Sequence, residues 1–102
     1  MLPLLPFEFE WDDNKCQRTL QDRGFDFGFA SQAFSDPEAF RERDTRLEHG
    51  EDRVRLYGQI QKKFVVVFYI ERQGRLRIIS TRRANSREIQ AHRQRRTNAS
   101  DA

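Results

Sequence analysis

The sequence has little cysteine and no long apolar run. Its 102 residues include one cysteine, Cys16, which has no partner for an internal disulfide. No second Cys or His stands at zinc-ligand spacing, which argues against the common zinc modules. Apolar stretches fall short of the roughly 18 residues of a membrane span, and the opening MLPLLPF lacks the basic segment of a secretion signal. We therefore expect a cytoplasmic protein with no membrane contact, no metal and no cofactor.

The length of the chain limits the number of domains and the size of the core. A chain of 102 residues supports one domain with one modest core. Nine phenylalanines supply large apolar side chains for that core, while 34% charged residues indicate a heavily solvated surface. We expect a single domain over residues 1–96 and a flexible C-terminal tail over residues 97–102.

Positive and negative charges are divided unequally along the chain. Residues 1–71 hold 10 Lys and Arg against 14 Asp and Glu, a net charge of −4, whereas residues 72–102 hold 9 Arg against 2 acidic residues, a net charge of +7. A basic segment on an acidic body suggests a phosphate-bearing partner or an acidic protein surface. A solvated charged face explains the same composition, so composition alone leaves both interpretations open.

Two helices are predicted in the first third of the chain. The first follows an aspartate cap at position 12 or 13 and runs to about Gln21. The second follows a cap at Asp26, covers Phe27–Phe34 and stops before Pro37, because proline restricts the residue that precedes it.

The middle of the chain reads as a series of strands. Residues 53–60 alternate polar and apolar side chains, which predicts a strand with one wet and one buried face. Residues 64–70 are apolar on both faces and therefore predict a central, covered strand. A turn at Gly74 leads into a third strand over residues 76–81, and residues 38–42 can add a fourth strand at the edge.

The last predicted element is a helix that begins after Asn85. The side chain of Asn85 can cap it, and Glu88 three residues later completes a capping box. Past Ile89 this helix has almost no apolar face, so it is either weakly docked or used for contacts. The expected fold is α+β: an antiparallel meander of three to four strands, packed with two N-terminal helices and one C-terminal helix.

Arginines concentrate on the predicted sheet and at its exit. Guanidinium groups on a rigid sheet suit bidentate phosphate contacts, because little freedom is lost on binding. For any single arginine, pairing with a nearby carboxylate is the more ordinary explanation, whereas the group as a whole favours phosphate binding. The arginines in question are Arg53, Arg55, Arg75, Arg77, Arg82 and Arg83.

Short sequence blocks stand in a distinctive order between residues 7 and 92. They are FEWDDNK, an RG pair before a phenylalanine, AFSDP, GEDRV, a valine-rich strand, and RLRIISTRRANSRE. In this order and spacing, the chain resembles the BrnT family of toxins from type II toxin-antitoxin systems. The resemblance implies a RelE-like fold and a metal-independent endoribonuclease that arrests growth. It also implies a BrnA-type antitoxin that covers the toxin and carries it to operator DNA, in a complex that leaves room for toxin dimerisation.

Cleavage of RNA without a metal ion requires two proton transfers and stabilisation of negative charge on the phosphate. The 2′-OH attacks the adjacent phosphate, so the protein must deprotonate that hydroxyl, stabilise the phosphorane and protonate the leaving oxygen. Arginines can stabilise the phosphorane, but they stay protonated and are poor acids and bases. Glu51, His49, Lys15 and Tyr57 are candidates for the proton transfers, none of them decisive.

The predicted site consists of two sets of residues. The catalytic set is Arg77, Arg82, Arg53 and Glu51, and the RNA-contacting set is Arg55, Arg75, Arg83, Lys15 and Trp11. Glu51 is as easily a partner that holds Arg53 in place, and Trp11 is either a base-stacking platform or part of the core. Two rival functions stay open: a weakly catalytic relative that binds an antitoxin in a DNA repressor complex, and a basic nucleic-acid-binding domain outside any toxin system.

Overall fold

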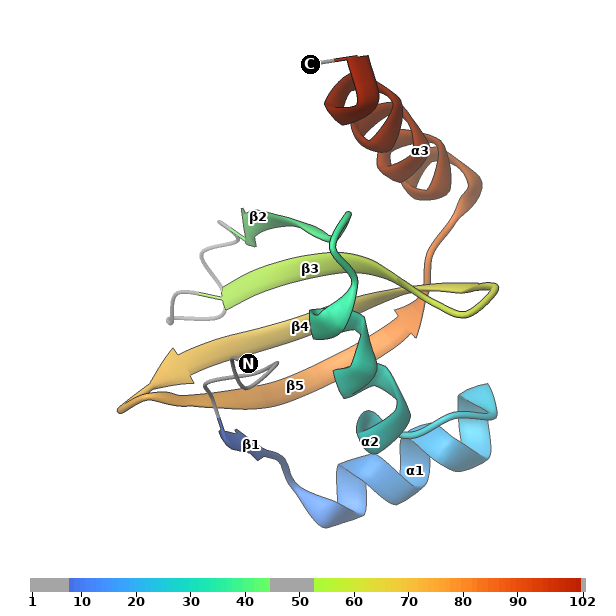
Figure 1. The fold of residues 1–102 in the computed structure, drawn as a ribbon. Coiled ribbons are helices and arrows are strands. Elements are labelled where there is room, and N and C mark those ends of the chain that lie inside the picture. The colour runs from blue at the N-terminus through green and yellow to red at the C-terminus, as the bar shows by residue number, and fades with distance from the viewer. Residues whose placement is uncertain (1–7, 45–52, 102) are drawn as a thin grey trace.

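The computed structural model describes residues 8–44 and 53–101, and it confirms the α+β class. Figure 1 shows one twisted sheet with helices at its sides. Within these residues, five strands lie in the order β1 (Glu8–Glu10), β5 (Arg75–Arg83), β4 (Lys63–Arg72), β3 (Arg53–Ile60) and β2 (Phe40–Asp44). The predicted meander is present as β3, β4 and β5, with the doubly apolar strand β4 at its centre. The predicted edge strand is present as β2, which pairs antiparallel with β3.

The prediction of a purely antiparallel sheet with three to four strands is wrong in one respect. A fifth strand, β1, pairs parallel to β5 and makes the sheet mixed. It has only three residues, so its alternating pattern is too short to separate a strand from a loop. Its position comes from pairing across the chain, where Glu8 lies opposite Arg75 and Glu10 opposite Arg77.

The two N-terminal helices begin at the predicted aspartate caps. Helix α1 spans Asp13–Arg23, and its N-cap Asp12 accepts a hydrogen bond from the Lys15 backbone N–H. Gly24 ends it with φ of 83°, a conformation that glycine adopts without a Cβ penalty. Helix α2 spans only Phe27–Ala30 and continues as the 3₁₀ helix η1, Ser31–Ser35, so the predicted second helix is split into two short turns.

One face of the sheet packs against these helices and forms the main core. Leu56, Val67 and Ile78 of the three central strands are at most 1% exposed, and they lie in one cluster with Phe27 and Ala33. Burying such side chains contributes roughly 1.5–3 kcal/mol each. The helices α1, α2 and η1 are thereby fixed against this face of the sheet.

The opposite face of the sheet is also covered, which corrects the prediction of a wet face on residues 53–60. Tyr57 is 5% exposed and stacks on Phe40 with ring centroids 4.6 Å apart. Val66 and Phe68 complete this second cluster, and Ala91 of the last helix packs against it. The alternation of polar and apolar residues does not predict burial by an element that is distant in the sequence.

Helix α3, Ser86–Asp101, supplies part of that cover through Ala91, and the helix projects from the end of β5 beyond the sheet (Figure 1). The predicted capping box is present, because Asn85 and Glu88 exchange side-chain and backbone hydrogen bonds of 2.9 Å each. The helix is anchored by His92, which is 2% exposed and places Nε2 2.9 Å from Oδ2 of Asp36. The helix runs through residues 97–101, and the flexible tail over residues 97–102 stays a prediction.

Burial alone would raise the pKa of Asp36. Hydrogen bonds from the backbone N–H groups of Gln59 and Glu38, and then from His92, outweigh burial and lower that pKa. Asp36 therefore connects η1, β3 and α3 as a charged carboxylate. None of the helices within the described part of the chain is long and apolar enough to cross a membrane.

Candidate functional site

Two predicted phosphate-binding arginines meet over one aromatic ring. The guanidinium carbons of Arg53 on β3 and Arg82 on β5 lie 5.8 and 5.6 Å from the centre of the Phe68 ring on β4. Phe68 lies on the central strand between them. A ring face attracts and orients guanidinium groups at this distance. The sheet thus presents two positive charges around one ring, one from each strand that flanks β4, on the face that α3 partly covers.

Glu88 at the start of α3 holds Arg82 in a fixed orientation. Its two carboxylate oxygens accept hydrogen bonds of 2.8 and 2.9 Å from Nη1 and Nη2 of Arg82. This bidentate bond, followed in importance by a hydrogen bond from the Asn85 backbone, lowers the pKa of Glu88. The carboxylate that caps the helix therefore also sets the plane of the guanidinium.

Arg55 belongs to a separate polar group nearer the sheet edge. Its Nη2 lies 3.4 Å from Oε1 of Glu42, and the same oxygen accepts a 3.0 Å hydrogen bond from the Tyr57 hydroxyl. Burial and then the bond to Glu42 raise the pKa of Tyr57 to about 12. A buried phenol that holds its proton so firmly is a poor general base, so the structure disfavours Tyr57 in that role.

The two arginines at the start of β5 pair with the short strand β1. Arg75 lies 3.4 Å from Glu8, and Arg77 lies 3.3 Å from Glu10. The register of β5 shifts opposite Phe68 and Tyr69 of β4, where β5 holds one extra residue, Ile79, so Arg77 and Arg82 face the same side of the sheet. Regular alternation would have separated them. Arg83 is exposed, and alternation with Arg82 places it on the opposite face.

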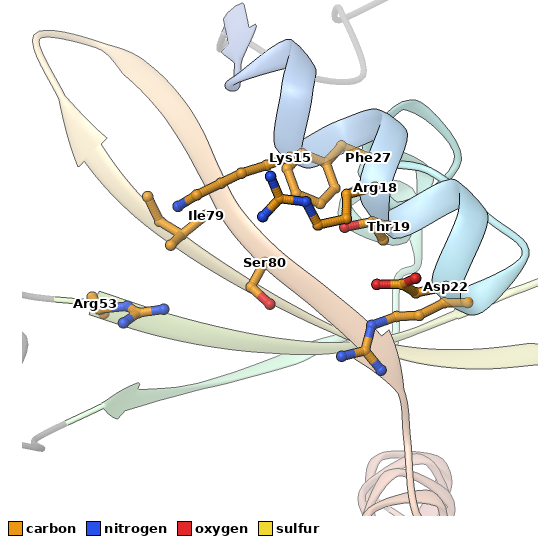
Figure 2. Close-up of a pocket in the computed structure, with 9 residues that line it drawn as sticks. Lys15, Arg18, Thr19, Asp22, Phe27, Arg53, Ile79 and Ser80 are labelled. Atoms are coloured by element: carbon orange, nitrogen blue, oxygen red, sulfur yellow. The ribbon is translucent and has the colours of Figure 1, made fainter.

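A shallow hollow of about 370 Å³ lies beside the arginine pair, between α1 and β5. In Figure 2, Lys15 and Arg18 reach from α1 toward Ile79 of β5, and Arg53 lies across the hollow. Among the described residues, the lining consists of Lys15, Arg18, Thr19, Asp22, Arg23, Phe27, Arg53, Ile79 and Ser80. Four cations against one carboxylate leave this lining with three surplus positive charges.

Sequence reasoning predicted Lys15 and Arg53 but missed Arg18 and Arg23. The available signal for Arg18 was its spacing, since a residue three positions after Lys15 lies on the same face of a helix. Arg23, five positions after Arg18, carried no such signal. The sequence also could not show that α1 would lie along β5, where Ser80 lines the same hollow.

The other predicted residues are placed less centrally or lie outside the described residues. Trp11 is half-buried, packs against the core and makes an edge contact with Phe27 at 6.3 Å between ring centres. This position matches the core interpretation of Trp11. Glu51 and His49 fall in residues 45–52, outside the part of the chain that the structure describes.

The family of this chain is identified from its sequence, over the region that holds the arginines and the hollow described above. A family model described as "Ribonuclease toxin, BrnT, of type II toxin-antitoxin system" matches residues 11–88, which is more than half of the chain. The chain belongs to the BrnT family. A search of curated proteins found no match.

Membership in the BrnT family assigns the chain to the ribonuclease toxins of type II toxin-antitoxin systems. A BrnT toxin is a ribonuclease of a type II toxin-antitoxin system, so RNA is its target and an antitoxin is its partner. The matched region runs from Trp11 to Glu88 and therefore contains both Arg53 and Arg82 together with the hollow beside α1.

Proposed function

We propose that this BrnT-family chain cleaves RNA without a metal ion, by attack of the 2′-OH on the adjacent phosphate. The observation that carries the proposal is the pair of guanidinium groups, Arg53 and Arg82, held over the Phe68 ring. Both come from strands, and Glu88 fixes one of them. Such preorganised donors stabilise developing negative charge most effectively, because they need no rearrangement during the reaction.

The reaction balances without any co-reactant. A base removes the proton from the 2′-OH, the 2′ oxygen forms a bond to phosphorus, and the bond from phosphorus to the 5′ oxygen breaks. The departing 5′ oxygen takes up a proton, which leaves a 2′,3′-cyclic phosphate and a 5′-OH. An internal nucleophile makes an activated metal-bound water unnecessary, and the arginines supply the charge stabilisation that the phosphorane needs.

The proposed roles of individual residues follow from this scheme. Arg53 and Arg82 hold the scissile phosphate, with Arg77 on the same face of the sheet as a further phosphate contact. Glu51, two residues before Arg53, is proposed as the base or as the group that orients it. Arg55, Arg75, Arg83 and Lys15 are proposed as contacts to the rest of the RNA, and so is the part of Trp11 that its packing against the core leaves exposed.

We further propose a cytoplasmic BrnA-type antitoxin as the partner, with operator DNA bound only through the complex and with toxin dimerisation inside it. The net charge of +7 on residues 72–102 supports an acidic or amphipathic partner segment on the basic sheet surface and the final helix. Such a segment would compete with RNA for the same arginines and so neutralise the toxin.

One observation favours a second candidate, a weakly catalytic binding module. Arg55, Arg77 and Arg82 each have a carboxylate partner within the described residues. Arginines held in such pairs are suited to structural support or to a protein interface as well as to phosphate binding. In this case the toxin would act with its antitoxin in a DNA repressor complex.

The deciding experiment is RNA cleavage by the purified toxin, freed of its antitoxin, in the presence of EDTA. The expected products carry a 2′,3′-cyclic phosphate, or its hydrolysis product, and a 5′-OH. Replacing the ribose hydroxyls by 2′-O-methyl groups should abolish cleavage. Cleavage that depends on added metal would contradict the mechanism, and no cleavage under any condition would favour the binding module.

A further inference from the structure

The hollow between α1 and β5 differs from the rest of the charged surface in how its cations are paired. Arg55, Arg75, Arg77 and Arg82 each lie within 3.5 Å of a carboxylate. Among the described residues, no ion pair holds Lys15, Arg18 or Arg23, and all three side chains are exposed. Their charge is therefore available to a ligand.

The ligand that fits this hollow is anionic and small in cross-section. Its volume of about 370 Å³ lies near the lower end of the range for small-ligand sites. Hydroxyl groups of Thr19 and Ser80 line it together with the cations, and hydroxyls and basic side chains are the groups that proteins commonly offer to nucleic-acid phosphates. One backbone phosphate with its sugar matches both the size and the chemistry.

The position of the hollow indicates where that phosphate comes from. Arg53 lines the hollow and also lies over the Phe68 ring beside Arg82. A single strand whose phosphate reaches Arg53 from the cleavage site therefore extends directly toward α1. A rigid helix that carries Lys15 and Arg18 along the strand can hold the next phosphate without ordering a loop.

We propose that the hollow is a subsite for a phosphate that flanks the scissile one, held by Lys15, Arg18 and Arg23. This inference rests on the proposed function, because it extends the path of the same RNA strand. The subsite holds the substrate rather than reacting with it. Binding there should be independent of base identity, because charged and hydroxyl side chains predominate in its described lining, and of the two apolar residues Phe27 is buried.

A substitution of Asp22 tests the proposal in the opposite direction, because it should raise RNA affinity. Its carboxylate lines the same hollow and repels a phosphate bound there. Asp22→Asn should therefore tighten RNA binding. Asp13→Asn is the matched control, because Asp13 is an exposed aspartate of the same helix that does not line the hollow, and it should leave affinity unchanged.

The main test measures binding of a 2′-O-methyl RNA, which cannot be cleaved, as a function of salt. The double variant Arg18→Gln with Arg23→Gln should weaken binding by roughly tenfold or more, since each removes charged hydrogen bonds. The plot of log affinity against log salt should become shallower by about 0.7 for each phosphate that the variant no longer neutralises. Lys62→Gln, which removes an exposed charge at the β3–β4 turn, should change neither quantity.

The outcomes separate this inference from the proposed function. With cleavable RNA, the double variant should raise KM while kcat stays near that of the wild type, because the subsite binds ground state and transition state alike. Unchanged affinity and salt slope in a folded double variant overturn the subsite, even if the wild type cleaves RNA.

Loss of antitoxin binding by the double variant, with intact RNA binding, would also overturn the subsite and assign the hollow to the antitoxin. A wild type that binds RNA through the hollow yet never cleaves it supports the subsite and refutes the nuclease.

Discussion

Arg82 and Glu88 form a bidentate pair, with N···O distances of 2.8 and 2.9 Å, that ties the last residues of β5 to the first turn of α3. Glu88 also accepts a hydrogen bond from the Asn85 backbone, so one carboxylate caps the helix and orients the guanidinium. The position of α3 and the geometry of the proposed phosphate site are therefore coupled through a single side chain.

The first prediction concerns the pH dependence of stability. The pKa of Glu88 is lowered in the folded chain, so its stabilisation is complete above the ordinary glutamate pKa and is lost as pH falls through the folded value. The free energy of unfolding should therefore decline on acidification, and less steeply in Glu88→Gln than in the wild type. Denaturant melts at a series of pH values measure this difference.

An exposed carboxylate supplies the control for that experiment. Glu71→Gln alters a solvent-exposed residue at the end of β4 and should leave the slope with pH as in the wild type. Identical slopes for Glu88→Gln and the wild type would show that the Arg82 pair contributes nothing to the folded state.

The second prediction concerns catalysis. Removing one preorganised donor to developing charge typically costs about 100-fold to 1000-fold in rate. Arg82→Ala and Arg53→Ala should therefore each lose cleavage to this extent and relieve growth arrest, while a melting transition confirms that they are folded. Arg82→Lys should stay strongly impaired, because lysine keeps the charge but not the bidentate geometry.

Arg83→Ala is the matched variant, since it removes the same charge one residue away on the opposite face. Because Arg83 is proposed to contact RNA away from the scissile phosphate, the loss should be far smaller than for Arg82. Arg77→Ala tests the remaining predicted arginine, whose pairing with Glu10 holds β1 to β5. Wild-type cleavage by folded Arg82→Ala and Arg53→Ala would remove both residues from the mechanism.

The third prediction concerns packing between η1 and the sheet. A Cβ at Gly58 would lie 2.8 Å from the Cβ of Ala33 and 2.9 Å from its carbonyl oxygen. Gly58→Ala should therefore destabilise the fold by about 1–3 kcal/mol, because the backbone of η1 must shift. Gly28→Ala is the control: its Cβ meets only Asp26 Oδ1, at 3.4 Å, and helix propensity favours alanine by about 1 kcal/mol. Equal melting temperatures for the two variants would contradict this packing.

The fourth prediction concerns the antitoxin. If an acidic segment is steered to the basic surface, the association rate should fall as salt rises, because screening weakens attraction between opposite charges. Stopped-flow or surface-based kinetics at increasing ionic strength can measure the rate. A rate that stays constant from low to high salt would place the interface on an apolar surface instead.

The sequence by itself determined the local features of this protein. Aspartates at positions 12 and 26 accept backbone hydrogen bonds within three residues, so the starts of α1 and α2 were predictable. The capping box of Asn85 and Glu88 is equally local. The central strand β4 was evident because an apolar run on both faces requires cover on both sides.

The tertiary structure decided everything that depends on pairing between distant residues. Strand β1 is too short to be recognised alone and exists through its partner β5, while the cover on Tyr57 comes from elements far along the chain. The bulge opposite Phe68 brings Arg77 and Arg82 to one face, although they are five positions apart. The hollow beside α1 likewise joins Arg18 to Ser80. These arrangements follow from side-chain packing and strand register across the whole chain, which local periodicity does not encode.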